Sequence, residues 1–427
     1  MQFGGLMPGE YKESAVKTLK SVGNIAKYAL CWVPVALVVG ILAGSASALL
    51  LASLELATQI RESHRWIITL LPLAGLAVGC LYHYFGTSVE RGNDLILDQI
   101  HLELREPRTA IPLRMSPLIL IGTFVTHLFG GSAGREGTAI QAGASLADQL
   151  AAPLRLDAGS RRVLLMIGIS AGFASVFGTP FAGAIFGTEV LAIGLVGYEA
   201  LFPCLVGAFA GDVTTRAWHI HHPLYSVGVF PTVSLAGIFW AVIAGAAFGM
   251  VSQGFVRSTH MLSTFFRRII RFAPLRPFAG GVLVALGVFG LRTTRYVGLG
   301  IPTIQASFYG LQPSWDWVGK WVFTSVTLGA GFKGGEVTPL FFIGATLGNA
   351  LSRILPLPPG LLAGMGFVGV FAGASNTPIA STIMALELFG GDIGAYAGVA
   401  CLISYLLSGD VSIYGTQRSG RGKFFRR

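Results

Sequence analysis

Long apolar runs recur along the whole chain and limit what it can fold into. A helix of about 20 apolar residues crosses the hydrocarbon core of a bilayer. Only helices and closed barrels satisfy their own backbone hydrogen bonds there. Charged residues make up 12% of the chain, about half the share in an average soluble domain. The sequence therefore predicts an all-α polytopic membrane protein, with apolar runs at residues 29–55, 66–85, 163–195, 234–256, 278–291 and 393–407 and shorter runs, broken by Gly or Pro, at 338–352 and 359–374.

The net charge of +10 does not indicate nucleic-acid binding, because the basic residues gather in both tails and in a few loops. These loops are 86–115, 151–162 and 257–276. Lys and Arg are enriched in the cytoplasmic loops of membrane proteins, so we expect both tails and all three loops on the cytoplasmic side. The four cysteines stand singly within apolar stretches and indicate neither disulfides nor a metal site.

A short phrase occurs twice in the chain. Gly-Arg-Glu-Gly-Thr at 134–138 is matched by Gly-Gly-Glu-Val-Thr at 334–338, which aligns Glu136 with Glu336 at a shift of 200 residues. At a shift of 198, residues 168–189 align with 366–387 and share a Thr-Pro pair and a final glutamate. Matches of this kind in one register indicate an internal repeat.

The distribution of basic residues predicts how the two repeats are oriented relative to each other in the membrane. The segment 211–233, between the halves, carries a single basic side chain and is expected to lie outside. With the N-terminus inside, the first half then crosses an odd number of times, so the repeat is inverted. Transporters built this way bind substrate near the midplane, between broken helices. The predicted parts are a cytoplasmic tail 1–27, a first half 28–212, an external linker 213–233, an inverted second half 234–417 and a basic cytoplasmic tail 418–427.

Each copy of the phrase directly precedes an apolar helical run. Backbone N–H groups at a helix N-terminus carry partial positive charge and favour an anion. Glycines such as Gly134 and Gly137 let the backbone approach an ion closely. A third helix start is predicted at 92–94, where Asn93 or Asp94 could cap the helix or contact an ion.

Glu136 at such a helix start has a particular chemistry. When ionised, its carboxylate resembles an anion and could occupy the same N–H groups as the substrate. When protonated, it is neutral and would leave, which links anion movement to proton movement. A lone carboxylate in a membrane segment is by default a functional candidate. The alternative is a fixed salt bridge with the neighbouring Arg135.

Other polar residues leave alternatives open. Glu336 follows the same logic as its counterpart, but Lys333, three residues earlier, could hold it in a structural pair. Glu189 and Glu387 lie at matching positions after the two Thr-Pro pairs, where they either cap helices or move protons. Tyr414 follows the last long apolar run and is either an interfacial anchor or an ion ligand.

Marks of other protein classes are missing from the sequence. It contains no Walker-type phosphate loop, no zinc-ligand spacing and no nucleophile elbow, so an enzyme is not predicted. His219, His221 and His222 form a short cluster without supporting carboxylates, which leaves open a metal site or an ordinary exposed loop.

The two phrases, the proline that follows the second at Pro339, and the late Tyr414 together resemble the CLC family of anion channels and antiporters. The resemblance runs from about residue 30 to residue 417. It implies a CLC-type inverted-repeat fold with broken and re-entrant helices, and a homodimer with one anion pathway per subunit. It also implies that Glu136 is the gating glutamate, and that no cofactor is needed.

Departures from the chloride-handling members resemble the fluoride/proton antiporter branch of the family. Thr138 stands where those members usually have proline, Asn93 where they have serine, and Val337 where they have phenylalanine. Val190 stands where chloride/proton exchangers carry an internal proton-transfer glutamate. The branch implies a role of Glu336 in proton or anion coupling, and a set of residues around the anion that comprises Asn93, Gly134, Arg135, Gly137, Thr138, Val337, Thr338 and Tyr414.

The sequence therefore predicts a fluoride/proton antiporter of a bacterial inner (plasma) membrane. Protons moving inward would drive fluoride out, and the protein would interact with these ions and the lipid bilayer but with no nucleic acid. A chloride/proton exchanger and a passive anion channel of the same fold are the alternatives, because the motifs do not separate these transport modes.

Overall fold

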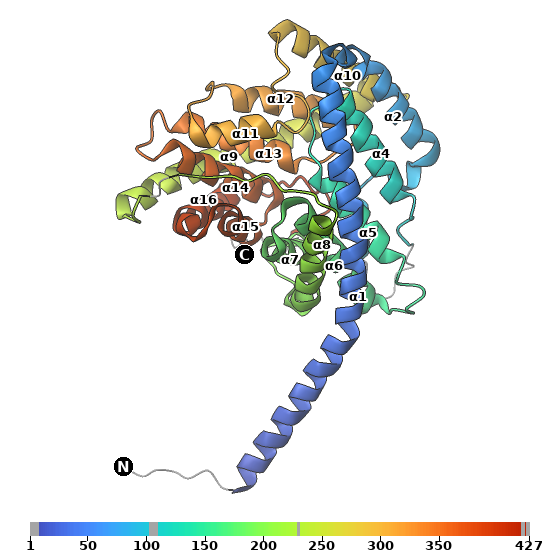
Figure 1. The fold of residues 1–427 in the computed structure, drawn as a ribbon, viewed down its shortest axis with the longest axis vertical. Helices are drawn as coiled ribbons and strands as arrows, with labels where there is room; N and C mark the ends of the chain where they lie inside the picture. Colours follow the sequence, from blue (N-terminus) through green and yellow to red (C-terminus); the bar gives the residue numbers. More distant parts are fainter. Residues whose placement is uncertain (1–7, 102–109, 229–230, 420–422, 424–427) are drawn as a thin grey trace.

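The computed structural model is built almost entirely of helices (Figure 1). It describes residues 8–101, 110–228, 231–419 and 423. The α-helices of this part are α1 Pro8–Ser63, α2 Leu71–Phe85, α3 Asn93–His101, α4 Met115–Leu128, α5 Glu136–Asp148, α6 Ala158–Phe177, α7 Pro180–Glu189, α8 Leu201–Ala217, α9 Leu235–Ile269, α10 Leu275–Leu291, α11 Ile301–Tyr309, α12 Asp316–Gly329, α13 Val337–Leu351, α14 Pro359–Ser375, α15 Pro378–Phe389 and α16 Gly394–Leu407.

Short elements complete the fold. Four 3-10 turns lie at η1 Arg65–Leu70, η2 Thr87–Val89, η3 Tyr198–Ala200 and η4 Gly391–Ile393. Two strands of two residues each, β1 Ala192–Ile193 and β2 Arg418–Ser419, pair in parallel. This pair ties the end of the chain to the segment that follows α7.

Several helices have the length and apolarity of membrane spans. Among the described residues, four helical stretches are long and apolar enough to cross a membrane, namely Lys27–Ser63, Arg65–Phe85, Ala158–Phe177 and Leu235–Ile269. The apolar run 163–195 is divided between α6 and α7, because Gly178 adopts a left-handed conformation (φ 73°) and Pro180 begins α7.

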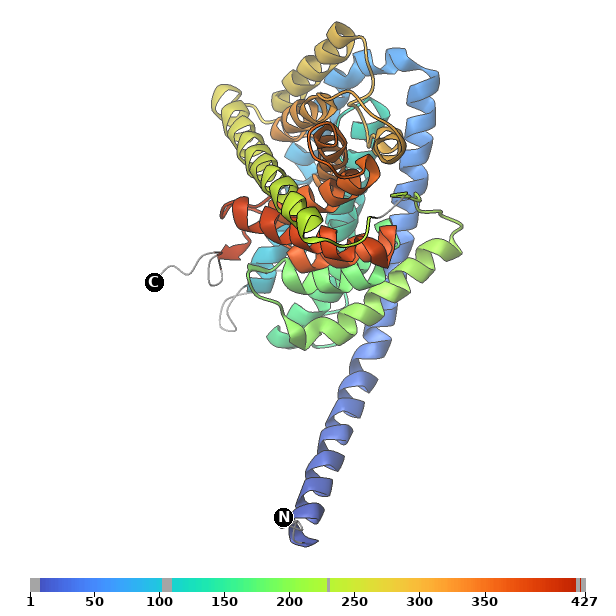
Figure 2. The same cartoon turned by 90° about the vertical axis from the view of Figure 1, so that its left-hand side faces the viewer.

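The helix boundaries refine the predicted parts of the chain. α1 already begins at Pro8 and its first turns project away from the other helices (Figure 1), so the expected N-terminal tail 1–27 is largely helical. α8 continues to Ala217, which places the last turn of that helix within the expected linker 213–233. α9 begins at Leu235 and lies along α16 (Figure 2).

The helix order repeats across the two halves. α4 to α8 are followed in the second half by α12 to α16, with the same order of helix starts and the same Thr-Pro break between α6 and α7 and between α14 and α15. Each break creates a helix N-terminus with unpaired N–H groups.

Glu189 and Glu387 cap these helices reciprocally. Glu189, at the end of α7, accepts hydrogen bonds from the Ile379 and Ala380 N–H groups of α15, at 3.0 and 2.8 Å. Glu387, in α15, accepts from the Phe181 and Ala182 N–H groups of α7, at 3.0 and 2.7 Å. Of the two roles left open by the sequence, the structure therefore supports capping.

Replacing Glu189 by alanine is expected to lower the free energy of unfolding by about 1–3 kcal/mol, because two buried N–H donors lose their acceptor. The measurement is thermal unfolding of the detergent-solubilised protein. Glu199→Ala serves as the control, since the Glu199 side chain is 59% exposed. Equal unfolding temperatures for the two variants would contradict the capping role.

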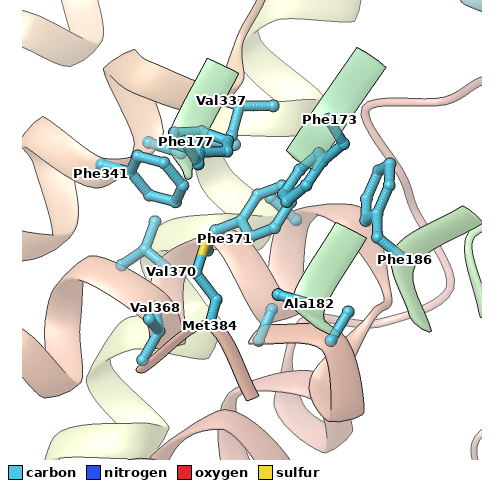
Figure 3. Packing of buried hydrophobic residues seen from close by; sticks show 14 of the residues in the cluster. Phe173, Phe177, Ala182, Phe186, Val337, Phe341, Val368, Val370, Phe371 and Met384 are labelled. Carbon is cyan, nitrogen blue, oxygen red and sulfur yellow. The ribbon is translucent and has the colours of Figure 1, made fainter. Parts of the chain in front are cut away.

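The centre of the molecule is an aromatic cluster formed by both halves (Figure 3). Phe173 of α6 stacks on Phe186 of α7 with ring centroids 4.3 Å apart. Phe371 of α14 packs against both rings, at 6.1 and 6.0 Å. The Phe186 ring in turn lies 6.3 Å from that of Tyr414, so this core borders the residues predicted to contact an anion.

Candidate functional site

The two copies of the repeated phrase meet in space. Gly134 N–H donates to the Gly335 carbonyl at 2.6 Å, and Gly335 N–H donates to the Gly134 carbonyl at 2.8 Å. α5 begins two residues after the first glycine and α13 two residues after the second. Two helix N-termini from opposite halves therefore lie side by side, which concentrates partial positive charge at one point.

Glu136 lies between these two helix starts and is fully buried. Its Oε2 accepts hydrogen bonds from the Arg135 N–H at 3.1 Å and from the Thr338 N–H at 3.0 Å. Its Oε1 accepts from the Thr338 hydroxyl at 2.5 Å. The carboxylate thus occupies a cradle of three donors contributed by both halves, as expected of a group that takes the place of an anion.

Arg135 contributes less to this arrangement than its sequence position suggests. Its guanidinium Nε lies 3.6 Å from Glu136 Oε1 and makes no hydrogen bond to any described residue. The geometry differs from a bidentate Arg–carboxylate pair, in which two short N–H···O bonds form. The Thr338 donors and the Arg135 backbone hold the carboxylate, and the guanidinium adds positive potential.

The loop before Glu136 is tied down on several sides. The Ser132 hydroxyl contacts the Thr324 hydroxyl at 2.9 Å, and the Ser132 N–H donates to Thr327 Oγ1 at 3.1 Å. Gly298 N–H donates to the Gly131 carbonyl at 2.9 Å, and His127 Nε2 lies 3.0 Å from the Ala133 carbonyl oxygen. A loop with so many tethers favours movement of the Glu136 side chain over movement of its backbone.

A small cavity lies beside Asn93 and Tyr414. It measures about 10 Å³ and is otherwise lined by apolar side chains, Phe186 among them. A volume of about 10–15 Å³ is the least that holds one water molecule. The Tyr414 hydroxyl and Asn93 Oδ1 have no hydrogen-bond partner among the described residues. The cavity therefore offers polar groups to one ion of the size of water.

Asn93 also connects this cavity to α5. It is the first residue of α3, as the predicted third helix start requires. A Cβ atom built on Gly137 would lie 3.2 Å from Asn93 Nδ2, so glycine at 137 allows the amide to approach the helix start. Asp94 is engaged elsewhere, because it accepts hydrogen bonds from Thr416.

Glu336 faces a larger cavity on the other side of the paired glycines. This cavity of about 170 Å³ is lined by charged side chains, including those of Arg91, Asp94, Lys333 and Glu336. Lys333 forms no ion pair within the described part of the chain, and its Nζ lies 3.9 Å from the centroid of the Tyr82 ring. Lys333 and Glu336 therefore line the same cavity without forming the ion pair that the sequence left open.

Two predicted residues lie near the site but face other groups. Thr138 Oγ1 is 2.7 Å from Thr123 Oγ1 of α4, so its hydroxyl links two helices. The Val337 side chain is buried in the hydrophobic cluster near Phe177 and Phe341 (Figure 3), which leaves its backbone as the part directed to the helix start.

Two buried cations close to the loop before Glu136 were not among the residues predicted from the sequence. Arg61 donates to the His127 carbonyl at 2.6 Å, and Lys320 donates to the Gly298 carbonyl at 2.6 Å. Neither forms an ion pair with a described residue. A basic residue within or beside an apolar run is the signal that could have identified them.

The histidine cluster does not assemble a metal centre in the part of the chain that the structure covers. No group of three or more His, Cys, Asp or Glu side chains suited to a metal ion occurs there. His222 Nδ1 instead lies 3.1 Å from the Val176 carbonyl oxygen, and its Nε2 lies 3.6 Å from Asp212.

Comparison with known proteins places this geometry in context. The family model for voltage gated chloride channels matches residues 74–409. A protein of Pseudomonas syringae pv. tomato named chloride/fluoride channel protein is 54% identical over 409 residues, which cover 94% of this chain and 90% of that protein.

Solved structures agree with the sequence matches. The crystal structure of a CLC-type fluoride/proton antiporter aligns with a TM-score of 0.87 at 34% identity, over 92% of this chain and 98% of that one. A slow cyanobacterial Cl⁻/H⁺ antiporter aligns with a TM-score of 0.74 at 20% identity, over 89% and 93% of the respective chains, and shows that the fold is shared. Together with the all-helical model, these matches confirm the predicted inverted-repeat architecture.

Proposed function

The chain belongs to the voltage-gated chloride channel (CLC) family, a family of multi-pass membrane proteins, and we propose that it exports fluoride in exchange for protons. The observation that carries this proposal is the Glu136 carboxylate, held by N–H and O–H donors of two opposed helix starts. The similarity to a fluoride/proton antiporter at 34% identity over nearly the whole chain supports the same assignment.

Proton coupling follows because the Glu136 carboxylate and fluoride compete for the same hydrogen-bond donors. An ionised Glu136 fills the cradle and keeps an anion out. Protonation removes the charge that the donors stabilise, so the side chain leaves and fluoride takes its place at the Thr338 N–H and hydroxyl. Return of the ionised carboxylate expels the anion. One site thus binds either the substrate or the deprotonated gate.

The small cavity supports fluoride as the anion. Fluoride is compact and accepts hydrogen bonds strongly, so it needs donors that replace its hydration. The Tyr414 hydroxyl, which has no hydrogen-bond partner among the described residues, is such a donor at a cavity of about 10 Å³, and Asn93, which can donate only from Nδ2, also lines this cavity. We assign these two residues to the central ion site.

Glu336 supplies a proton acceptor on the inner side. Its side chain is partly exposed to the cavity of about 170 Å³, whereas Glu136 is closed off. Thr338, which binds Glu136, lies two residues further along the chain. This short separation makes Glu336 the group best placed to exchange protons between the cavity and the gate.

The assembly and location that we propose are a homodimer in a bacterial inner membrane, with one pathway per subunit. The faces around 191–206 and 393–407 carry apolar side chains with large exposed fractions, including Tyr198 at 71% and Leu402 at 51%. Such patches suit either a partner subunit or lipid. The pathway elements all come from one chain, as the contacts of Glu136 illustrate.

A passive anion channel is the second candidate, favoured by the name chloride/fluoride channel protein of the 54% identical relative. The deciding experiment uses liposomes that contain the purified protein and are loaded with fluoride or chloride. Anion efflux and proton uptake are recorded together. The proposal expects fluoride efflux with stoichiometric proton uptake and much slower chloride efflux. Fluoride efflux without proton uptake would establish the channel, and equal chloride efflux would overturn the selectivity.

A further inference from the structure

Another polar cavity lies among the ends of four helices, next to the cavity of Glu336, with which it shares Tyr82, Glu90, Leu328, Phe332 and Lys333. It measures about 220 Å³ and is lined by the last turns of α2, α9 and α12, the first turn of α10 and the loops beside them. α2 and α10 pack side by side (Figure 1). Part of its wall, including Arg267 and Arg276, comes from 86–115 and 257–276, two of the segments expected on the cytoplasmic side from their basic residues.

The charges around this cavity are unbalanced. His83, Arg267, Arg276 and Lys333 line it, against the single acid Glu90. Confined like charges repel one another unless an anion lies between them. The three cations Arg267, Arg276 and Lys333, which come from three chain segments, therefore outnumber the single acid.

These cations retain free donors. Within the described residues, the Arg267 and Lys333 side chains make no hydrogen bond and no ion pair; Lys333 is held only over the Tyr82 ring. Arg276 donates from Nε to the Ile270 carbonyl at 2.9 Å and from Nη2 to the Arg271 carbonyl at 3.3 Å. These bonds fix the guanidinium and leave its remaining N–H groups for a ligand.

We propose that this cavity binds a phosphate group through Arg267, Arg276 and Lys333. A phosphate presents several charged oxygens at once, which suits donors converging from different helices, and Arg matches such oxygens in a planar, bidentate manner. Ser263, which also lines the cavity, adds a neutral hydroxyl donor, whereas the Thr87 hydroxyl already donates to the His83 carbonyl at 3.0 Å. Arg267 and Arg276 do not line the cavity of Glu336, whereas Lys333 lines both cavities, so the test rests on the two arginines.

Two sources share this chemistry, an anionic lipid headgroup and free phosphate. Basic pockets between membrane helices on the cytoplasmic side bind lipid headgroups. Apolar side chains next to the cavity are exposed, with Phe85 at 63%, Phe272 at 47% and Leu275 at 42%. They provide a surface for acyl chains, which free phosphate would not use.

The test measures ligand binding to the full-length, detergent-solubilised protein by native mass spectrometry and thermal unfolding. The probes are phosphatidylglycerol, phosphatidylcholine and inorganic phosphate. The variant Arg267→Gln/Arg276→Gln is compared with Arg268→Gln/Arg271→Gln, which removes the same charge from exposed neighbours that do not line the cavity. Arg267→Gln alone is included because it breaks no hydrogen bond of the fold.

We expect the wild type and the control to bind phosphatidylglycerol with equal affinity, and the cavity double variant to bind it about tenfold more weakly, since each charge-assisted bond is worth more than 1 kcal/mol. The single variant should show a smaller loss in the same direction. Stabilisation by inorganic phosphate without preference for phosphatidylglycerol would assign the site to free phosphate. Equal binding by both double variants, or no stabilisation by any phosphate, would overturn the proposal.

Discussion

Replacing Glu136 by glutamine is expected to abolish proton uptake while fluoride still crosses the membrane. Glutamine has the shape of the glutamate but cannot take up a proton, so no cycle of binding and release can be linked to pH. Its amide nitrogen would also face donors, because all three groups around the carboxylate donate hydrogen bonds. The side chain should therefore leave the cradle permanently, which keeps the anion path open.

The measurement is simultaneous fluoride efflux and proton uptake by liposomes that contain the variant. Proton uptake should fall to the leak of protein-free liposomes, while fluoride efflux continues. Glu199→Gln provides a control that removes an exposed carboxylate distant from the gate in sequence. Proton uptake that stays coupled in the Glu136 variant would show that another group carries the proton.

The repeat was the part of the fold most accessible from the sequence. The paired phrases and the paired Thr-Pro breaks predicted that two helix starts from opposite halves would face one point, and the Gly134–Gly335 hydrogen bonds place them there. For Glu189 and Glu387 the sequence left helix capping and proton movement open, and the hydrogen bonds of the structure support capping. That each half caps the other depends on the packing of helices 190 residues or more apart in the chain, and no local pattern encodes it.

The separation of two residues in the sequence is a poor guide to contact between their side chains where the chain is not helical. Lys333 and Glu336 are three residues apart, a spacing that brings side chains together on a helix. Both residues precede the start of α13, so that rule does not apply. In the turn, where Gly334 has a φ of 149°, the Lys333 ammonium lies over the Tyr82 ring instead of pairing with Glu336, although both side chains line the same cavity.

Thr138 and Thr338 stand at matching positions of the two phrases but have different partners. Thr338 binds Glu136, whereas Thr138 binds Thr123. The symmetry of the two halves ends at Glu136, because Glu136 accepts hydrogen bonds from donors of both halves and Glu336 does not occupy the equivalent position. Thr338 supplies two of the three donors to Glu136, and Glu336 faces the cavity of about 170 Å³ instead.

The second large effect that we expect is that of Glu336→Gln, because Glu336 does not share the role of its counterpart Glu136. Fluoride efflux and proton uptake should both fall by at least about tenfold, because a positioned proton-transfer group typically contributes a factor of about 100 or more. Val190 occupies the position of the usual internal proton carrier, so the chain has no glutamate there to replace Glu336. Both fluxes fall together because Glu136 can release the site only after a proton reaches it.

Three comparisons separate proton transfer by Glu336 from a structural role. Glu336→Asp retains a carboxylate and should restore part of both fluxes, whereas a purely structural glutamate would be replaced better by the isosteric glutamine. Glu336→Gln in combination with Glu136→Gln should transport fluoride as fast as Glu136→Gln alone, since the open gate no longer waits for a proton. The thermal unfolding of each variant is recorded beside its fluxes. Unchanged proton uptake in a folded Glu336→Gln protein would rule out the residue as the inner proton carrier and direct the search to the other acids of the same cavity, beginning with Asp94.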